Sequence, residues 1–182
     1  MLGNRHVGMA VAGFLERHHP PNVVVDPIIH SSNRAELLDG PGQDMIRNVL
    51  LPLADVITPN TDEAAFLAGF PISGPQDLQA AAEKIQQKGT KSVVITGGHL
   101  DQPLDFLLTA AGTAHQFPGE RVESCCTHGT GCAFATALAC NLALGKGLVE
   151  GVRLAQQYVR KAIRQGFPVG RGIAPINHLC DM

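Results

Sequence analysis

Charge, basic clusters and long apolar runs are all scarce in this sequence. Charged residues make up only 16% of the 182 residues, the formal net charge is −2, and no run of lysine and arginine occurs. Sequence-independent binding of nucleic acid needs clustered basic side chains, so nucleic acid is not an expected partner. No apolar stretch is long enough to cross a bilayer, and residues 1–19 lack the basic leader and apolar run of a signal peptide. We therefore expect a cytoplasmic protein with no membrane partner.

Paired cysteines are also missing. The five cysteines are odd in number and have no paired-ligand spacing, so the sequence indicates neither a disulfide framework nor a zinc site. The hydrophobic fraction of 45% is typical of a folded globular protein. The length suits one domain, and because neither repeats nor a dividing linker are evident, we expect a single domain over residues 1–182.

Helical and extended patterns alternate along the chain. The predicted helices cover residues 6–18, 42–50, 60–67, 76–88, 131–144 and 150–165. β-Branched strands are predicted at 22–26, 55–58 and 92–96, and a hairpin-like pair at 104–109 and 114–124 around Gly112 and Gly119. Glycines typical of helix C-caps follow the last two helices, Gly145 and Gly166. This alternation predicts an α/β fold with a parallel sheet covered on both faces.

Polar residues and glycines follow the predicted strands. They are Asp26, the Thr58–Asn60 segment, the Thr96–Gly98 segment and the loop that leads to Gly129. In open α/β sheets ligands bind beyond the carboxyl ends of the strands. We therefore expect a ligand site formed by these segments.

The segment Thr127–Cys132, with the sequence THGTGC, precedes an apolar helical run. Its two glycines allow a tight turn that aims successive N–H groups at one point, and the positive end of the helix dipole adds to the attraction for an anion. Such a loop would stabilise charge on a phosphate during transfer. The alternative is an ordinary glycine-rich loop before a buried helix.

Cys132 falls in the first turn of that helix. The dipole would stabilise its thiolate, which could then accept a proton from an attacking hydroxyl. The alternative is a small buried hydrophobic residue, as most unpaired cysteines are.

Asn60 and Glu63 have a spacing that fits two roles. They could hold Mg²⁺ directly or through water, with Asp26 reaching the same ion, because Mg²⁺ prefers oxygen ligands. Asn at the N-cap with Glu three residues later also forms a capping box, and Asp26 before Pro27 could simply shape a turn. Gly97 and Gly98 could allow a phosphate chain to approach, or could only turn the backbone.

Taken together, these segments resemble the hydroxymethylpyrimidine/phosphomethylpyrimidine kinases of thiamine biosynthesis, members of the ribokinase-like superfamily. The resemblance follows the chain in order through MLGN, VVVDPII, ITPNTDEAAFLAG, VVITGGH, THGTGC and APINH. It implies a three-layer α/β/α fold with a mostly parallel central sheet. It also implies ATP-dependent phosphorylation of 4-amino-5-hydroxymethyl-2-methylpyrimidine and then of its monophosphate.

The resemblance also implies site roles. Gly129, Thr130 and Gly131 would form the anion hole, Cys132 would be the catalytic base, and Asp26 and Glu63 would be associated with Mg²⁺. ATP would contact Asn60, Thr96, Gly97, Gly98, His128, Gly129 and Gly131. Family habit further favours a homodimer or a larger homo-oligomer.

Three positions depart from the family pattern. Thr96 stands where the family commonly has a lysine that contacts phosphates, Asn33 lies near a usual glycine, and Cys126 replaces a frequent asparagine. The chain also begins at a motif that the family places after its first strands. We therefore expect those strands to be missing, which would leave an exposed apolar sheet edge. Pyridoxal or pyridoxine kinase activity and a non-catalytic nucleotide-binding remnant remain alternatives.

Overall fold

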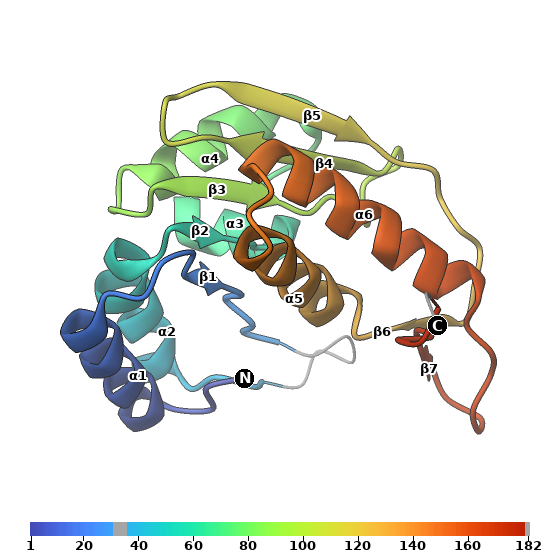
Figure 1. Ribbon diagram of the computed structural model, residues 1–182, viewed down its shortest axis with the longest axis horizontal. Helices are drawn as coiled ribbons and strands as arrows, with labels where there is room; N and C mark the ends of the chain where they lie inside the picture. Colours follow the sequence, from blue (N-terminus) through green and yellow to red (C-terminus); the bar gives the residue numbers. More distant parts are fainter. Residues whose placement is uncertain (31–35, 181–182) are drawn as a thin grey trace. The chain divides into compact units, whose positions relative to one another are not determined.

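The computed structural model describes residues 1–30 and 36–180. Contacts divide the chain into two compact units, Met1–Pro118 and Gly119–Met182 (Figure 1). The expectation of a single domain stays a prediction, and each unit is described by itself. Asn33 lies outside the described residues. Within 1–30 and 36–180, no helix is both long and apolar enough to cross a membrane.

A five-stranded sheet forms one layer of the first unit. Its strands, in spatial order, are β1 (Val24–Val25), β2 (Val56–Ile57), β3 (Ser92–Ile95), β4 (Leu104–Leu108) and β5 (Ala114–Pro118). The first three pair in parallel, whereas β4 pairs antiparallel with β3, and β5 pairs antiparallel with β4. The α/β class is confirmed, and each predicted strand range contains a strand.

The β4–β5 hairpin turns at Gly112, whose φ of 76° favours glycine. The predicted second arm, 114–124, is too long, because β5 ends at Pro118, opposite the first residue of β4. Gly119 therefore lies beyond the hairpin and does not shape its turn.

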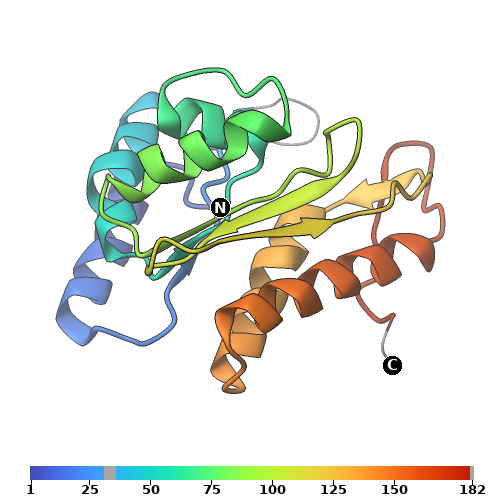
Figure 2. The same ribbon diagram turned by 90° about the horizontal axis from the view of Figure 1, so that it is seen from above.

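Four α-helices accompany this sheet. They are α1 (Arg5–His18), α2 (Gly40–Met45), α3 (Thr61–Ala68) and α4 (Leu78–Gln86), with a 3₁₀ turn at Pro75–Asp77 before α4. α3 and α4 pack against each other, and α4 lies on β3 and β4 (Figure 2). Their fully buried side chains, which include Leu67, Leu78 and Ile85, join Val93 and Ile95 of β3 in one core.

The predicted helix 42–50 forms, but not as one α-helix. α2 begins at Gly40 because Asp39 caps it, its carboxylate accepting from Gly42 N at 2.8 Å. A π-helix then covers Ile46–Leu50, and a 3₁₀ turn follows at Leu51–Leu53. Pro52 has no N–H with which to continue the helical hydrogen bonds, so the helix ends here. Its last turns are the wider π-helix and then the tighter 3₁₀ turn.

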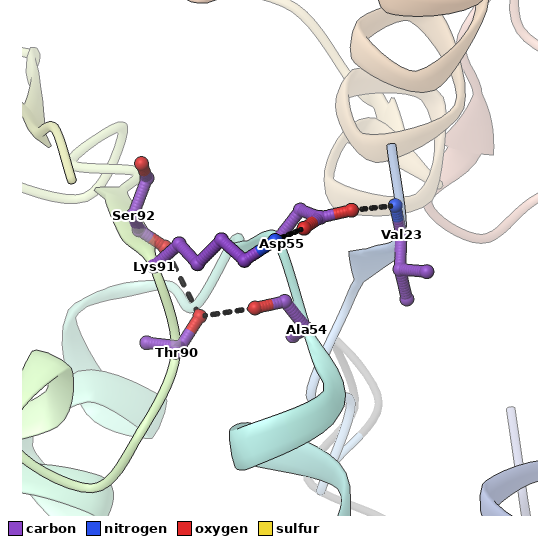
Figure 3. A network of polar contacts seen from close by, with 6 residues as sticks. All are labelled: Val23, Ala54, Asp55, Thr90, Lys91 and Ser92. Atoms are coloured by element: carbon purple, nitrogen blue, oxygen red, sulfur yellow. Dashed lines mark hydrogen bonds and ion pairs between the residues drawn. The ribbon is translucent and has the colours of Figure 1, made fainter. Parts of the chain in front are cut away.

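A polar network joins the amino ends of the parallel strands (Figure 3). Asp55 accepts from Val23 N at 2.8 Å and from Lys91 Nζ at 2.6 Å, while the Thr90 hydroxyl donates to the Ala54 carbonyl at 3.2 Å. Burial would raise the pKa of Asp55, but these hydrogen bonds outweigh it and the pKa is lowered. The network therefore aligns the starts of β1, β2 and β3.

The second unit combines two helices with two short parallel strands. They are β6 (Cys126–His128), α5 (Thr130–Ala143), α6 (Leu148–Arg164) and β7 (Ala174–Pro175). α5 and α6 pack together, and Gly151 allows a close approach, because a Cβ there would lie 3.1 Å from Leu138 Cδ1. Both predicted helices are confirmed.

The two predicted C-cap glycines behave differently. Gly145 follows α5 with a φ of 81°, as expected of a C-cap glycine. Gly166 is not among the residues with positive φ. Gly166 instead leaves room for the Cys126 side chain, since a Cβ at Gly166 would lie 2.5 Å from Cys126 Cβ.

Candidate active site

In the first unit, candidate residues lie at the carboxyl ends of the parallel strands. Asp26 follows β1, and Asn60 and Thr96 follow β2 and β3. A parallel β-bridge pairs Asn60 with Thr96, and Thr96 N donates to the Pro59 carbonyl at 2.9 Å. The structure thus brings together the segments that the sequence places after β2 and β3.

The capping box is present at the start of α3. Glu63 N donates to Asn60 Oδ1 and Asn60 N donates to Glu63 Oε2, both at 2.9 Å. The other carboxylate oxygen of Glu63 accepts weakly from Ile29 N at 3.5 Å. Glu63 is only 7% exposed, so the cap holds a buried carboxylate in one fixed place.

Asp26 is half-buried and Glu63 is buried, and the charge of Asp26 acts on Glu63. Burial raises the pKa of Asp26 to about 6. Burial also raises the pKa of Glu63 to about 7, against the hydrogen bond from Asn60 N, and the charge of Asp26 raises it further. Asp26 Oδ2 is buried and has no hydrogen-bond partner within the described chain. The positive amino terminus of the chain lowers the pKa of Asp26, but by less than burial raises it.

Such a donor set fits a magnesium ion. Mg²⁺ is usually bound by one or two carboxylates and keeps several waters. Within residues 1–30 and 36–180, no group of three or more His, Cys, Asp and Glu side chains that could hold a metal ion is present. A cation here would satisfy Asp26 Oδ2 and would offset the repulsion by Asp26 that helps to raise the pKa of Glu63.

Gly97 and Gly98 differ in what surrounds them. Gly97 is buried, its N–H donates to Asp105 Oδ1 at 3.0 Å, and a Cβ there would lie 2.1 Å from the Leu104 carbonyl oxygen. Gly98 is exposed, and a Cβ would meet nothing within 4 Å. A phosphate chain would therefore have to approach Gly98, since the amide of Gly97 is already engaged.

Asp105 is a residue that the sequence interpretation missed. It is 9% exposed and fixes the loop after β3 through Gly97 N. The available signal was an acidic residue inside an otherwise apolar strand pattern, LDFLL. A carboxylate at such a position needs a hydrogen-bond donor when it is buried.

In the second unit, the segment Thr127–Cys132 forms a turn into α5. Gly129 is the N-cap with a φ of 86°, and its carbonyl accepts the first helical bond, from Ala133 N at 2.9 Å. The amides of Thr130 and Gly131 precede that bond, so α5 itself gives them no backbone partner. The turn therefore presents N–H groups at a helix start, the arrangement that attracts anions.

Cys132 is exposed and lies at the third position of α5. It is not the buried hydrophobic residue of the alternative interpretation. Its side chain borders an open groove of about 530 Å³ along α5 and α6, together with Thr136, Tyr158 and His178. A thiol here is accessible to an alcohol substrate.

The tail of the second unit returns to the same turn. Ile176 N donates to the His128 carbonyl at 3.2 Å, while the Tyr158 hydroxyl donates to the His178 carbonyl at 3.1 Å. His178 Nε2 lies 3.9 Å from where a Cβ of Gly129 would stand. No local spacing in the sequence links His178 to Gly129, so their proximity follows from the way the tail packs.

Comparisons with solved structures identify the fold of the chain. A pyridoxal kinase from Bacillus subtilis, solved as an ADP complex, matches 99% of the chain with a TM-score of 0.90 and 33% identity, over 68% of its own chain. A Staphylococcus aureus pyridoxal kinase, solved with AMP-PCP and pyridoxal, matches 98% with a TM-score of 0.86 and 31% identity, over 65% of its own chain. The fold is therefore that of the ribokinase-like small-molecule kinases, as expected.

The family follows from the sequence match. The phosphomethylpyrimidine kinase family model covers residues 1–177, and the chain belongs to that family. The hydroxymethylpyrimidine/phosphomethylpyrimidine kinase of Streptomyces coelicolor is 39% identical over 178 residues, 98% of this chain. The thiamine biosynthesis bifunctional protein ThiED of Geobacter sulfurreducens is 38% identical over 181 residues, also 98%. This chain spans 66% of the first protein's length and 37% of the second's.

Proposed function

We propose that the chain transfers the γ-phosphate of ATP to the hydroxymethyl group of 4-amino-5-hydroxymethyl-2-methylpyrimidine, or to its monophosphate, in thiamine biosynthesis. The observation that carries this proposal is the exposed THGTGC turn at the start of α5 in a chain that matches the kinase family over residues 1–177. The printed names of the relatives support the choice of the pyrimidine.

The second unit would supply the anion site and the base. The amides of Thr130 and Gly131, beyond the turn at Gly129, would bind the phosphate, with His128 bordering the nucleotide. The substrate oxygen would attack phosphorus while its proton passes to the Cys132 thiolate. Charge stabilisation by the amides should contribute more to the rate than the base does.

The first unit would supply the magnesium-associated carboxylates and part of the nucleotide site. Asp26 and Glu63 would hold Mg²⁺, which when bound neutralises charge on the phosphate oxygens. Asn60, fixed by its bond to Glu63 N, would face the ion and the phosphates. Thr96 and Gly98 would border the nucleotide, and Gly97 would position that loop through its bond to Asp105.

Pyridoxal kinase activity is the second enzymatic candidate. It is favoured by the match to two pyridoxal kinases with TM-scores of 0.90 and 0.86. A nucleotide-binding remnant without catalysis is a third candidate, and Thr96 favours it, because a hydroxyl cannot replace the charge of a phosphate-binding lysine.

The test compares three alcohols under one set of conditions. Purified protein is incubated with Mg²⁺ and ATP plus the hydroxymethylpyrimidine, its monophosphate or pyridoxal, and the phosphorylated product is measured by mass spectrometry. We expect product from one or both pyrimidines, at a higher rate than from pyridoxal. Faster transfer to pyridoxal would favour the second candidate. An ATP-induced rise in unfolding temperature without any product would favour the remnant.

Cellular setting and assembly are part of the same proposal. We propose a cytoplasmic enzyme that works as a homodimer or larger homo-oligomer. Light scattering after size-exclusion chromatography measures the assembly, and a monomer at all accessible concentrations would contradict it.

A further inference from the structure

Two adjacent cysteines lie directly before the phosphate-binding turn. Cys125 is exposed and Cys126 is buried, yet their Sγ atoms are only 3.8 Å apart. In a regular strand, successive side chains point to opposite faces. Cys125 precedes β6, and the pairing of β6 with β7 is irregular between Cys126 and His128. The two thiols are therefore in contact beside a place where the strand pairing is irregular.

We propose that Cys125 and Cys126 form a reversible vicinal disulfide, an oxidation site that lowers nucleotide binding at the adjacent turn. Formation of the bond does not depend on the kinase assignment. The effect on nucleotide binding does rest on the proposed function.

The exposures of the two thiols set the order of reaction with a small-molecule disulfide. The Cys125 thiolate attacks one sulfur of the oxidant, forms a mixed disulfide and releases one thiolate, which takes up the proton that Cys125 lost. The Cys126 thiolate then attacks Cys125 Sγ and releases the second thiolate, which takes up the proton that Cys126 lost. One internal disulfide forms while the oxidant is reduced to two thiols. Burial raises the pKa of the Cys126 thiol, which agrees with its acting second.

Geometry makes this bond easy to reverse. Adjacent Cα atoms are about 3.8 Å apart across a trans peptide, whereas disulfides usually join Cα atoms about 4.4–6.8 Å apart. A bond outside this range is strained and readily reduced, which is characteristic of labile or regulatory disulfides. A small thiol should therefore restore the reduced pair.

Hydrogen bonds hold the pair to β7 and to Ser124. The Cys125 carbonyl accepts from Ala174 N at 2.9 Å, and Cys126 N donates to Ser124 Oγ at 3.0 Å. Cys126 cannot move freely, because its side chain packs against Gly166. Closing the disulfide must rotate the intervening peptide, and only two residues separate Cys126 from Gly129. A shift of about 1 Å in groups that bind phosphate can cost far more than tenfold in rate.

The first experiment detects the bond itself. Wild type, Cys125→Ser and Cys140→Ser are treated with oxidised glutathione, alkylated and analysed by intact mass and peptide mapping. We expect wild type and the Cys140→Ser control to lose two hydrogen atoms at a Cys125–Cys126 peptide, reversibly with dithiothreitol, and Cys125→Ser to form no such bond. A stable glutathione adduct on Cys125, or a bond that joins other cysteines, would overturn the proposal.

The second experiment detects the consequence. ATP affinity of the reduced and oxidised forms is measured by calorimetry, and we expect oxidation to weaken it by about tenfold or more in wild type and Cys140→Ser only. Equal affinities in both redox forms would overturn the regulatory claim. If the reduced protein does not bind ATP, the kinase proposal fails. Whether the disulfide forms is then still answered by the mass measurement.

Discussion

At the scale of single residues, the main electrostatic feature is the pair formed by the half-buried Asp26 and the buried Glu63. Their pKa values are raised to about 6 and about 7, from ordinary values of 3.8 and 4.5. A carboxyl group with a raised pKa binds its proton more tightly in the folded state than in the unfolded state. It therefore stabilises the fold at low pH, and this contribution is lost as pH rises through the folded pKa.

This sign gives a testable pH dependence. Without divalent cations, the contribution of Glu63 should lower the free energy of unfolding by about 3 kcal/mol between pH 4.5 and pH 8, most of it lost before pH 7.5. Denaturant unfolding of wild type and Glu63→Gln at several pH values isolates this contribution. Glutamine can still accept from Asn60 N, so the cap survives. Equal pH dependence in both proteins would show that Glu63 titrates normally.

Cys132 has a chemical role that mutation can separate from binding. Cys132→Ser should lower the turnover number by about 10²–10⁴-fold, since serine is a poor base, while ATP affinity stays nearly intact. Steady-state kinetics together with calorimetry measure both effects. A large loss of ATP affinity would instead make Cys132 a structural residue of the turn.

At the scale of elements, the loop after β3 depends on one glycine far more than on its neighbour. Gly97→Ala would place a Cβ 2.1 Å from the Leu104 carbonyl oxygen, and we expect a loss of stability of about 1–3 kcal/mol. Gly98→Ala is the matched control, because its Cβ would meet nothing within 4 Å, and it should change stability by less than about 0.5 kcal/mol. Urea unfolding compares the two. Similar losses would contradict the packing role of Gly97.

The sequence predicted elements whose signals are local. The capping residues Asn60 and Glu63 and the glycine before α5 specify helix starts, and the structure has both helices where expected. The π-helix at Ile46–Leu50 was not predicted, because helical periodicity does not distinguish it from an α-helix. The difference between Gly145 and Gly166 was also missed, since only the packing of Cys126 explains Gly166.

Parts of the candidate site depend on contacts distant in sequence. The repulsion between Asp26 and Glu63 arises from tertiary packing, so spacing alone left the capping and metal interpretations equally open. The structure shows the cap and adds an unpartnered Asp26 Oδ2, which the cap does not explain. The positions of Asp105 and His178 likewise follow from long-range packing.

At the scale of the whole molecule, magnesium should oppose the pH effect. If Asp26 and Glu63 hold Mg²⁺, a concentration 100 times the Kd should stabilise the fold by about 2.7 kcal/mol at pH 8, and EDTA should remove the gain. Thermal unfolding measures this shift, and Glu63→Gln should lose most of it. An equal gain in Glu63→Gln would place the magnesium elsewhere.

The central claim is that the amides at the start of α5 bind nucleotide phosphates. Calorimetric titration of ATP with Mg²⁺ into wild type, Gly131→Ala and Gly131→Asp tests it most directly, since Gly131 is exposed and a Cβ there meets nothing within 4 Å. An aspartate in the first turn favours the helix, so the fold should persist while the phosphate is repelled. The account predicts near-normal affinity for Gly131→Ala and a loss of at least about 100-fold for Gly131→Asp. Equal affinity in the two variants would contradict it.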